Sequence, residues 1–175
     1  MTKAELRQYM RKTSVERQAD PEKEAEGAME FWRKVEASKE FRSADAILIF
    51  MAMPDEIPTR EFIEKWRSSK RFAIPRVKGE NLELKEYNPD FLSPGYKGIP
   101  EPTDEAADIS PDEIDFALIP GTAFDRSGHR MGRGKGFYDR LLPQLHCPTM
   151  AVCQEWRIVD EVPTDPWDIR IDIIP

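Results

Sequence analysis

The residues best suited to chemistry lie between positions 121 and 140. This segment holds five of the nine glycines of the chain and five Lys or Arg against two Asp, an excess of three positive charges in a protein of net charge −7. Glycine lets backbone N–H groups approach a ligand closely, and a helix expected to start near Phe137 would point its positive end at the same place. Strand, glycine-rich loop and helix start together predict an anion site, and phosphate groups fit it best.

Two known phosphate loops do not match this segment. A Walker loop needs Ser or Thr after Gly-Lys and a glycine five positions before that Gly-Lys pair. Here Gly136 follows Gly134-Lys135, and His129 stands at the earlier position. A Rossmann fingerprint follows the first strand, whereas these glycines follow a late one. A basic loop without any ligand remains the alternative.

The pattern of this segment resembles the signature of the 5-formyltetrahydrofolate cyclo-ligase (methenyltetrahydrofolate synthetase) family. The matching run reads Pro120-Gly121-x-Ala123-Phe124-Asp125-x-x-Gly128-x-Arg130-x-Gly132-x-Gly134-x-Gly136-Phe137-Tyr138-Asp139-Arg140. Other family blocks are matched by Lys3-x-x-x-Arg7, Met51-x-x-x-Asp55-Glu56-Ile57-x-Thr59, Ile74-Pro75-Arg76, Gly98-Ile99-x-Glu101-Pro102, and Val162-Pro163 with Asp168 and Asp172. In order, these blocks cover essentially the whole chain, so we expect one cyclo-ligase domain over residues 1–175.

The resemblance implies an ATP- and Mg²⁺-dependent closure of 5-formyltetrahydrofolate to 5,10-methenyltetrahydrofolate. The formyl oxygen would attack the γ-phosphate, N10 of the folate would capture the activated carbon, and phosphate would leave with ADP as the other product. Such a reaction needs alignment and charge stabilisation from the protein more than it needs a base. His129 and His146 are therefore not expected to be catalytic.

The resemblance also assigns residues to the two substrates and to the metal. The ATP contacts it implies are Lys3, Arg7, Arg130, Gly132, Arg133, Gly134, Lys135, Gly136, Phe137 and Tyr138. The folate contacts are Met51, Glu56, Arg133, Gly134, Lys135, Gly136 and Phe137, with Arg133 and Lys135 stabilising the transferring phosphoryl group as catalytic residues. Asp139 and Asp168 match the family's magnesium positions, and carboxylates suit that hard cation.

Each of these residues also has an ordinary structural explanation. Lys3 and Arg7, four residues apart, could be a solvated helix face. Asp139 could cap a helix, Met51 could belong to the core, and Glu56 could be a loop acid. Two departures from the family pattern stand out: Phe137 begins an aromatic pair that is often two tyrosines, and the chain stops at Pro175.

The elements that must position these residues predict an α/β fold. Helices are expected from Lys3, where Thr2 and Glu5 form a capping box, over 22–38, after a Thr59 cap, and from Phe137. Strands are expected at 46–52, 72–75 with its proline at the strand end, 82–87, 116–119, 149–153 and 169–174, with a surface excursion at 88–114. Continuous apolar strands alternating with helices indicate a Rossmann-like open, mostly parallel sheet flanked by helices, as in the NagB/RpiA/CoA-transferase-like class.

Composition narrows the classes of protein. The 175 residues include 26 basic and 33 acidic residues, which does not suit a nucleic-acid binder. The longest apolar run, residues 46–53, is too short for a membrane span, and the N-terminus has no secretory signal pattern. Cys147 and Cys153 are expected to be reduced thiols. We expect a cytoplasmic monomer acting on small molecules. Two alternatives remain: a relative of the sugar-phosphate isomerases or CoA-transferases, and a non-catalytic folate- or nucleotide-binding module.

Overall fold

A five-stranded sheet in the order β3-β2-β1-β6-β9 forms the centre of the computed structural model, which describes residues 1–175. Its strands are β1 (Ala46–Leu48), β2 (Arg71–Lys78), β3 (Asn81–Glu86), β6 (Phe116–Pro120) and β9 (Thr149–Val152). β1 is parallel to both β2 and β6, and β6 is parallel to β9. Only the β2–β3 hairpin is antiparallel. The predicted mostly parallel α/β sheet is thus confirmed.

Both faces of this sheet are buried. Ile47, Phe116 and Leu118 belong to a cluster of 19 buried residues on one face, which includes residues of α2, α3 and α4. Leu48 and Ile119 belong to a second cluster of 14 on the other face. Alternate residues of one strand therefore reach opposite cores, which explains why these strands read as unbroken apolar runs.

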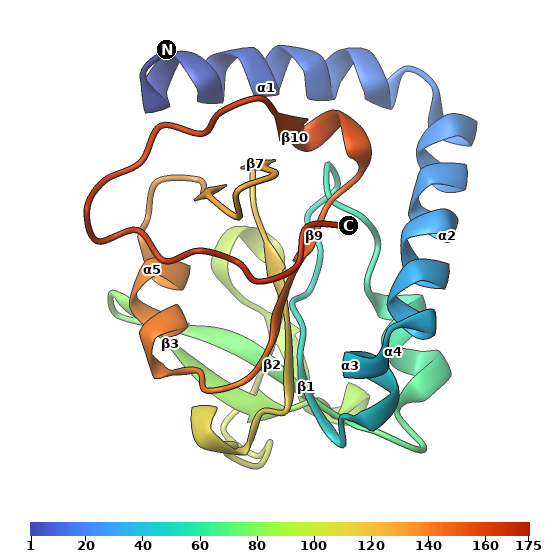
Figure 1. Ribbon diagram of the computed structural model, residues 1–175. Helices are drawn as coiled ribbons and strands as arrows, with labels where there is room; N and C mark the ends of the chain where they lie inside the picture. The colour runs from blue at the N-terminus through green and yellow to red at the C-terminus, as the bar shows by residue number, and fades with distance from the viewer.

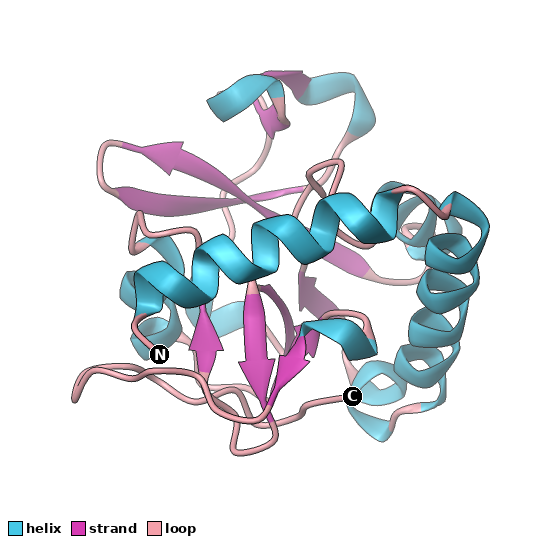
Figure 2. Ribbon diagram, turned by 90° about the horizontal axis from the view of Figure 1, so that it is seen from above, coloured by secondary structure: helices cyan, strands magenta, loops and turns pink.

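Five α-helices surround the sheet: α1 (Lys3–Gln18), α2 (Pro21–Ala37), α3 (Lys39–Ser43), α4 (Arg60–Trp66) and α5 (Phe137–Leu141). The capping box that begins α1 is present, with Thr2 and Glu5 bonding each other's backbone N–H. α1 lies across the end of the sheet and α2 descends beside it (Figure 1), and the view from above shows α1 nearest the viewer (Figure 2). None of the helices combines the length and the apolarity that crossing a membrane requires.

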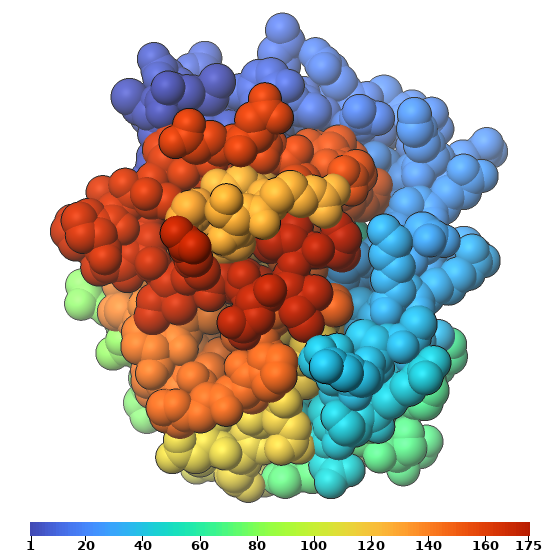
Figure 3. All heavy atoms as spheres, viewed as in Figure 1, coloured from blue at the N-terminus to red at the C-terminus, as the bar shows by residue number.

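Two smaller sheets complete the fold. β10 (Ile158–Val159), β7 (Ala123–Asp125) and β8 (Arg130–Met131) form one, and β4 (Leu92–Pro94) pairs with β5 (Pro100–Pro102) in the other. Short 3-10 turns occur at Pro89–Phe91, Tyr96–Gly98, Pro111–Glu113, Leu142–Gln144 and Glu155–Arg157. The C-terminal segment packs around the β7–β8 turn (Figure 3), where the Ile171 N–H donates to the Gly128 carbonyl at 2.8 Å.

Several predicted elements differ from the structure. The strand expected at 169–174 is a single bridge between Met150 and Ile173. Pro75 lies inside β2 and not at its end; β1 pairs only as far as Ala73, so no strand on that side needs a proline N–H. The apolar run from residue 46 pairs as a strand only to Leu48.

Thr59 stands at the N-cap of α4 but makes no side-chain cap bond. Its hydroxyl donates to the Phe50 carbonyl at 2.6 Å and accepts from the Ala52 N–H at 3.2 Å. This buried hydroxyl therefore fixes the segment that follows β1, which carries Met51 and Glu56 toward the site described next.

Candidate active site

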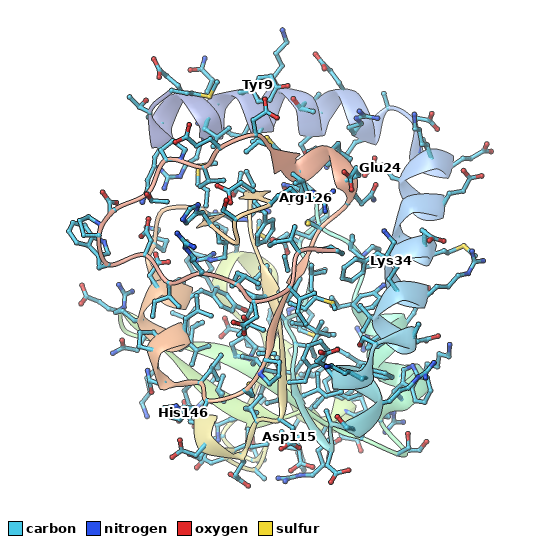
Figure 4. The ribbon with its side chains drawn as sticks, in the orientation of Figure 1. Tyr9, Glu24, Lys34, Asp115, Arg126 and His146 are labelled. Carbon is cyan, nitrogen blue, oxygen red and sulfur yellow. The ribbon has the colours of Figure 1, made fainter.

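A cavity of about 200 Å³ opens at the carboxyl ends of the parallel strands. Its walls come from the segment after β1, the β2–β3 hairpin, the β4–β5 hairpin and the glycine-rich segment after β6. Ligands of open α/β sheets gather at this end of the strands. Figure 4 shows Asp115 and His146 at the opposite end, below the amino ends of β6 and β9, and neither residue lines the cavity.

One side of the cavity is apolar and aromatic. Met51 is 8% exposed and lines the cavity, so it serves both the core and the site. Phe137 meets Tyr96 of the β4–β5 hairpin edge to face, with 5.9 Å between ring centres. Flat apolar surfaces of this kind suit a planar heteroaromatic ligand.

Glu56 is one of three acidic residues that line the cavity, together with Glu101 and Asp139. Its Oε2 accepts the Met53 N–H at 2.9 Å and its Oε1 accepts from Arg133 Nη2 at 3.1 Å. Arg133 also donates to Asp55 Oδ1 at 2.7 Å. Burial raises the pKa of the Asp55 carboxyl, but Arg133 and Arg157 outweigh burial and hold that pKa below its usual value. A fixed carboxylate and a guanidinium therefore face one another at the cavity.

The glycine-rich loop over residues 132–136 offers free backbone donors. None of its five amides donates to an acceptor within the protein, and Gly134 and Gly136 have φ of +97° and +70°. On the outer side, Arg7 Nε donates to the Gly132 carbonyl at 3.1 Å. Consecutive free N–H groups among cations are suited to an anion ligand, the kind of site that the sequence predicts here.

The helix after this loop is shorter than expected. α5 has five residues, with Gly136 as its N-cap, because Pro143 stops the α-helical pattern and the chain continues as a 3-10 turn. Leu141 and Leu142 are buried, and Leu145 packs against the same core cluster. The dipole of so short a helix is small, so the loop amides and the side chains must supply most of the positive potential.

A second polar cluster lies beyond the loop. Lys3 Nζ contacts Asp165 Oδ2 at 2.6 Å and Asp168 Oδ2 at 2.7 Å. Burial lowers the pKa of Lys3, but these two carboxylates raise it by more, so its pKa lies above the usual value. Burial raises the pKa of Asp168, whereas Lys3, the Asp165 amide and Arg130 lower it by more.

Arg130 connects this cluster with the cavity. Its buried guanidinium donates to Asp139 Oδ1 at 2.7 Å and to the Pro120 carbonyl at 3.2 Å, and lies 5.6 Å from the Tyr138 ring centre. Its Nε is buried without a partner. Burial and the charge of Glu56 raise the pKa of Tyr138, which keeps its hydroxyl protonated.

Asp139 and Asp168 fit a divalent cation in part. Each uses one oxygen for a basic side chain, whereas Asp139 Oδ2 and Asp168 Oδ1 form no hydrogen bond within the protein. No group of three or more His, Cys, Asp or Glu forms a complete metal site. Mg²⁺ is commonly held by one or two carboxylates plus substrate phosphates, so these two residues suit an ion that arrives with a nucleotide.

The structure thus divides the predicted site residues into two sets. Met51, Glu56, Arg130, Gly132, Arg133, Lys135, Gly136, Phe137, Tyr138 and Asp139 line the cavity. Lys3, Arg7, Gly134 and Asp168 do not, and Arg7 packs against Gly134 from the far side of the loop. Asp139 is not a helix cap, because α5 has no side-chain cap bond.

Two polar residues at the site were assigned no role by the sequence. Asp55 bonds Arg133, and Arg157 bonds Asp55 and the Thr122 carbonyl. The two histidines lie elsewhere: His129 Nδ1 is 2.9 Å from the buried Asp125 carboxylate. Both cysteines are free thiols, as predicted, and burial raises the pKa of Cys147 to about 11 and of Cys153 to about 12.

Comparison with known proteins gives consistent matches. The model of the 5-formyltetrahydrofolate cyclo-ligase family matches residues 1–175. The Escherichia coli K12 5-formyltetrahydrofolate cyclo-ligase is 31% identical over 140 residues, covering 75% of this chain and 77% of that protein, and the mouse enzyme is 28% identical over 191 residues, covering 97% and 89%. The NMR structure of Aquifex aeolicus 5,10-methenyltetrahydrofolate synthetase superposes with a TM-score of 0.89 at 27% identity, covering 99% of this chain and 89% of that one.

Proposed function

This chain belongs to the 5-formyltetrahydrofolate cyclo-ligase family, and from that premise we propose that it uses ATP and Mg²⁺ to convert 5-formyltetrahydrofolate into 5,10-methenyltetrahydrofolate, releasing ADP and phosphate. One observation supports the two-substrate reaction above others. The 132–136 loop has an aromatic and acidic cavity on one side and the Lys3, Arg7 and Asp168 cluster on the other. The free amides of this loop can bind a phosphoryl group that arrives from the side of Lys3, Arg7 and Asp168, next to a ligand in the cavity.

The folate would occupy the cavity. Its pterin ring would lie against Met51 and Phe137, and the carboxylate of Glu56 would accept hydrogen bonds from the amino edge of the ring. Glu56 is oriented for this role before any ligand binds, because the Met53 N–H and Arg133 already hold both of its oxygens. Holding a reactant in one pose removes entropy from the barrier.

The triphosphate would lie along the outer side of the loop, held by Lys3, Arg7 and the loop amides. Mg²⁺, bound through Asp139 and Asp168, would supply charge neutralisation at the phosphates. Arg133 and Lys135 would stabilise the charge that develops as the formyl oxygen bonds to the γ-phosphorus and the β–γ bridging oxygen departs with ADP. Such fixed donors act most strongly where charge appears in the transition state.

The second step would close the ring. N10 attacks the carbon that bears the phosphate, the N10 proton is lost, and phosphate leaves with the electron pair of the carbon–oxygen bond. The Phe137–Tyr96 contact and the Met51 side chain would hold the pterin ring in the cavity, with the activated carbon beside N10. They would also limit access of water to that carbon. A tyrosine hydroxyl at position 137 is not needed for either step.

We further propose that the protein acts as a cytoplasmic monomer on these two small molecules. Only six large apolar side chains are exposed, among them Val15, Met29 and Trp167, whereas obligate subunit interfaces are large and more hydrophobic than other surfaces. Light scattering after size exclusion should give a mass near 20.3 kDa.

The experiment that tests the function is incubation with 5-formyltetrahydrofolate in the presence and absence of ATP–Mg²⁺. The conjugated methenyl product, followed by its absorbance, should appear only when all three components are present. Product without nucleotide consumption would contradict a ligase, and binding of both ligands without product would favour a non-catalytic binding module.

A further inference from the structure

Arg157 joins three loops of the site although it does not line the cavity. It lies in the 3-10 turn Glu155–Arg157 that follows β9, and its side chain is only 5% exposed. Its Nη1 donates to the Thr122 carbonyl, in the segment after β6, at 3.1 Å. Its Nη2 donates to the backbone carbonyl of Asp55, in the segment after β1. β1, β6 and β9 are neighbours in the sheet, so one guanidinium ties together three successive strand-end loops.

Asp55 extends this connection to the cavity. Its Oδ2 lies 3.3 Å from Arg157 Nη2, and its Oδ1 accepts from Arg133 Nη2 at 2.7 Å. The two oxygens of one carboxylate are thus held by two arginines, one buried beneath the loop and one at the cavity. Arg133 in turn contacts Glu56 at 3.1 Å. The chain of contacts runs from Arg157 through Asp55 to the two charged groups proposed to meet the folate.

The packing around Arg157 restricts its movement. Its guanidinium lies 4.3 Å from the centre of the Trp156 ring, which contacts the small core of α1 and β7. A guanidinium presents its donors in a rigid planar fork, and here the fork spans two carbonyls and a carboxylate. Neither a lysine nor a glutamine can make all of these bonds at once.

We propose that Arg157 is a positioning residue for the folate side of the site. It fixes the 53–57 turn so that Glu56 keeps its direction, and it orients Asp55 so that Arg133 stays at the cavity before a ligand binds. This inference rests on the proposed function, because it takes the folate as the ligand that Glu56 and Arg133 bind. Lys3 and Arg7, on the nucleotide side, have no contact with this network.

Arg157→Gln is the informative variant, because it removes the fork and leaves Asp55 still paired with Arg133. The KM for 5-formyltetrahydrofolate should rise about 10- to 100-fold, as expected when charged hydrogen bonds that orient the site are lost. The KM for ATP should change less than about twofold. Arg157→Lys keeps the charge and should give a smaller rise of about 2- to 10-fold.

Arg126→Gln provides a matched control. Arg126, labelled in Figure 4, bonds the Pro175 carbonyl at 2.8 Å and Glu155 of the same 3-10 turn at 2.6 Å, but it has no contact with Asp55. This variant should leave both KM values unchanged. An unchanged folate KM in Arg157→Gln, or an equal rise in both KM values, would overturn the positioning role. If that variant does not fold, Arg157→Lys decides by the same criterion.

Hydrogen exchange separates this inference from the proposed function. The Met53 N–H is bonded to Glu56 Oε2 and the Glu56 N–H to the Met53 carbonyl. Both amides should exchange at least several-fold faster in the Arg157 variants and at the wild-type rate in Arg126→Gln. This result needs no turnover, so an inactive wild-type protein would contradict the function alone, and unchanged exchange would contradict the inference alone.

Discussion

Replacing Glu56 by Gln changes one side chain where the proposed folate site meets the glycine-rich loop. Glutamine keeps one oxygen to accept the Met53 N–H, at 2.9 Å in the wild-type protein. Its amide nitrogen would then face Arg133, so a donor meets a donor where the wild type has a 3.1 Å ion pair. The second acceptor oxygen, which the amino edge of a pterin requires, is lost.

The size of the effect follows from these contacts. A hydrogen bond to a charged group contributes about 1.5–3 kcal/mol, so the affinity for 5-formyltetrahydrofolate should fall about 10- to 100-fold. The loss of stability should be smaller. The Arg133 side chain is 38% exposed, so solvent screens the ion pair and about 1 kcal/mol or less is lost. That corresponds to a decrease in Tm of about 2–4 °C for a chain of this length.

Calorimetric titration with 5-formyltetrahydrofolate and, separately, with ATP–Mg²⁺ measures both affinities. Glu36→Gln is a matched control, since Glu36 accepts from Lys65 at 2.6 Å and from Trp66 at 3.0 Å far from the cavity. It should cost similar stability and leave both affinities intact. The reasoning is refuted if Glu56→Gln binds folate normally, or if it weakens ATP binding as much as folate binding.

Three further outcomes are expected. Asp139→Asn should keep its Tm to within about 4 °C, because the ion pair of Asp139 with Arg130 is partly exposed. The variant should nevertheless need more Mg²⁺ for turnover. An unchanged dependence of turnover on Mg²⁺ concentration would remove Asp139 from the metal site. Asp125 is buried and accepts four hydrogen bonds. Burial raises the pKa of its carboxyl, but those bonds lower that pKa by more. The carboxylate therefore stabilises the fold fully above about pH 4, and this stabilisation is lost as pH falls through the lowered folded pKa. The urea midpoint should therefore fall less steeply below pH 4 in Asp125→Asn than in the wild type. Gly128→Ala should lower the free energy of unfolding, measured with urea, by more than about 2 kcal/mol, because φ is +90° and a Cβ would lie 2.5 Å from the Ile171 carbonyl oxygen. Gly79→Ala is the control: at φ +62° with open space around the Cβ, it should lower that free energy by only about 1 kcal/mol.

The sequence predicted the elements whose signal is local. The capping box at Thr2 and the unbroken apolar runs in β1 and β6 are short-range patterns, and the structure confirms each element. β7, β8 and β10 were missed because strands of two or three residues have no measurable alternation. The strand expected at 169–174 failed for a tertiary reason, since the Ile171 N–H is taken by the Gly128 carbonyl.

The features of the site also differ in whether the sequence alone could identify them. The glycine-rich loop could be found from composition, because its glycines and cations are visible in the sequence itself. The role of Arg157 could not be, since its partners lie 35 and 102 residues away and only folding brings them together. The short length of α5 follows from Pro143, which the expectation of a helix from Phe137 did not take into account.

The central claim is that a phosphoryl group passes across the 132–136 loop to the formyl oxygen of a folate in the cavity. The most direct measurement uses 5-formyltetrahydrofolate labelled with ¹⁸O in the formyl group and analyses the released phosphate by mass spectrometry. If the formyl oxygen attacks the γ-phosphorus, the label should appear in phosphate, one atom for each methenyl product and each ADP formed. Unlabelled phosphate accompanying methenyl product would contradict the account, because the oxygen would then have left the folate without ever bonding to phosphorus.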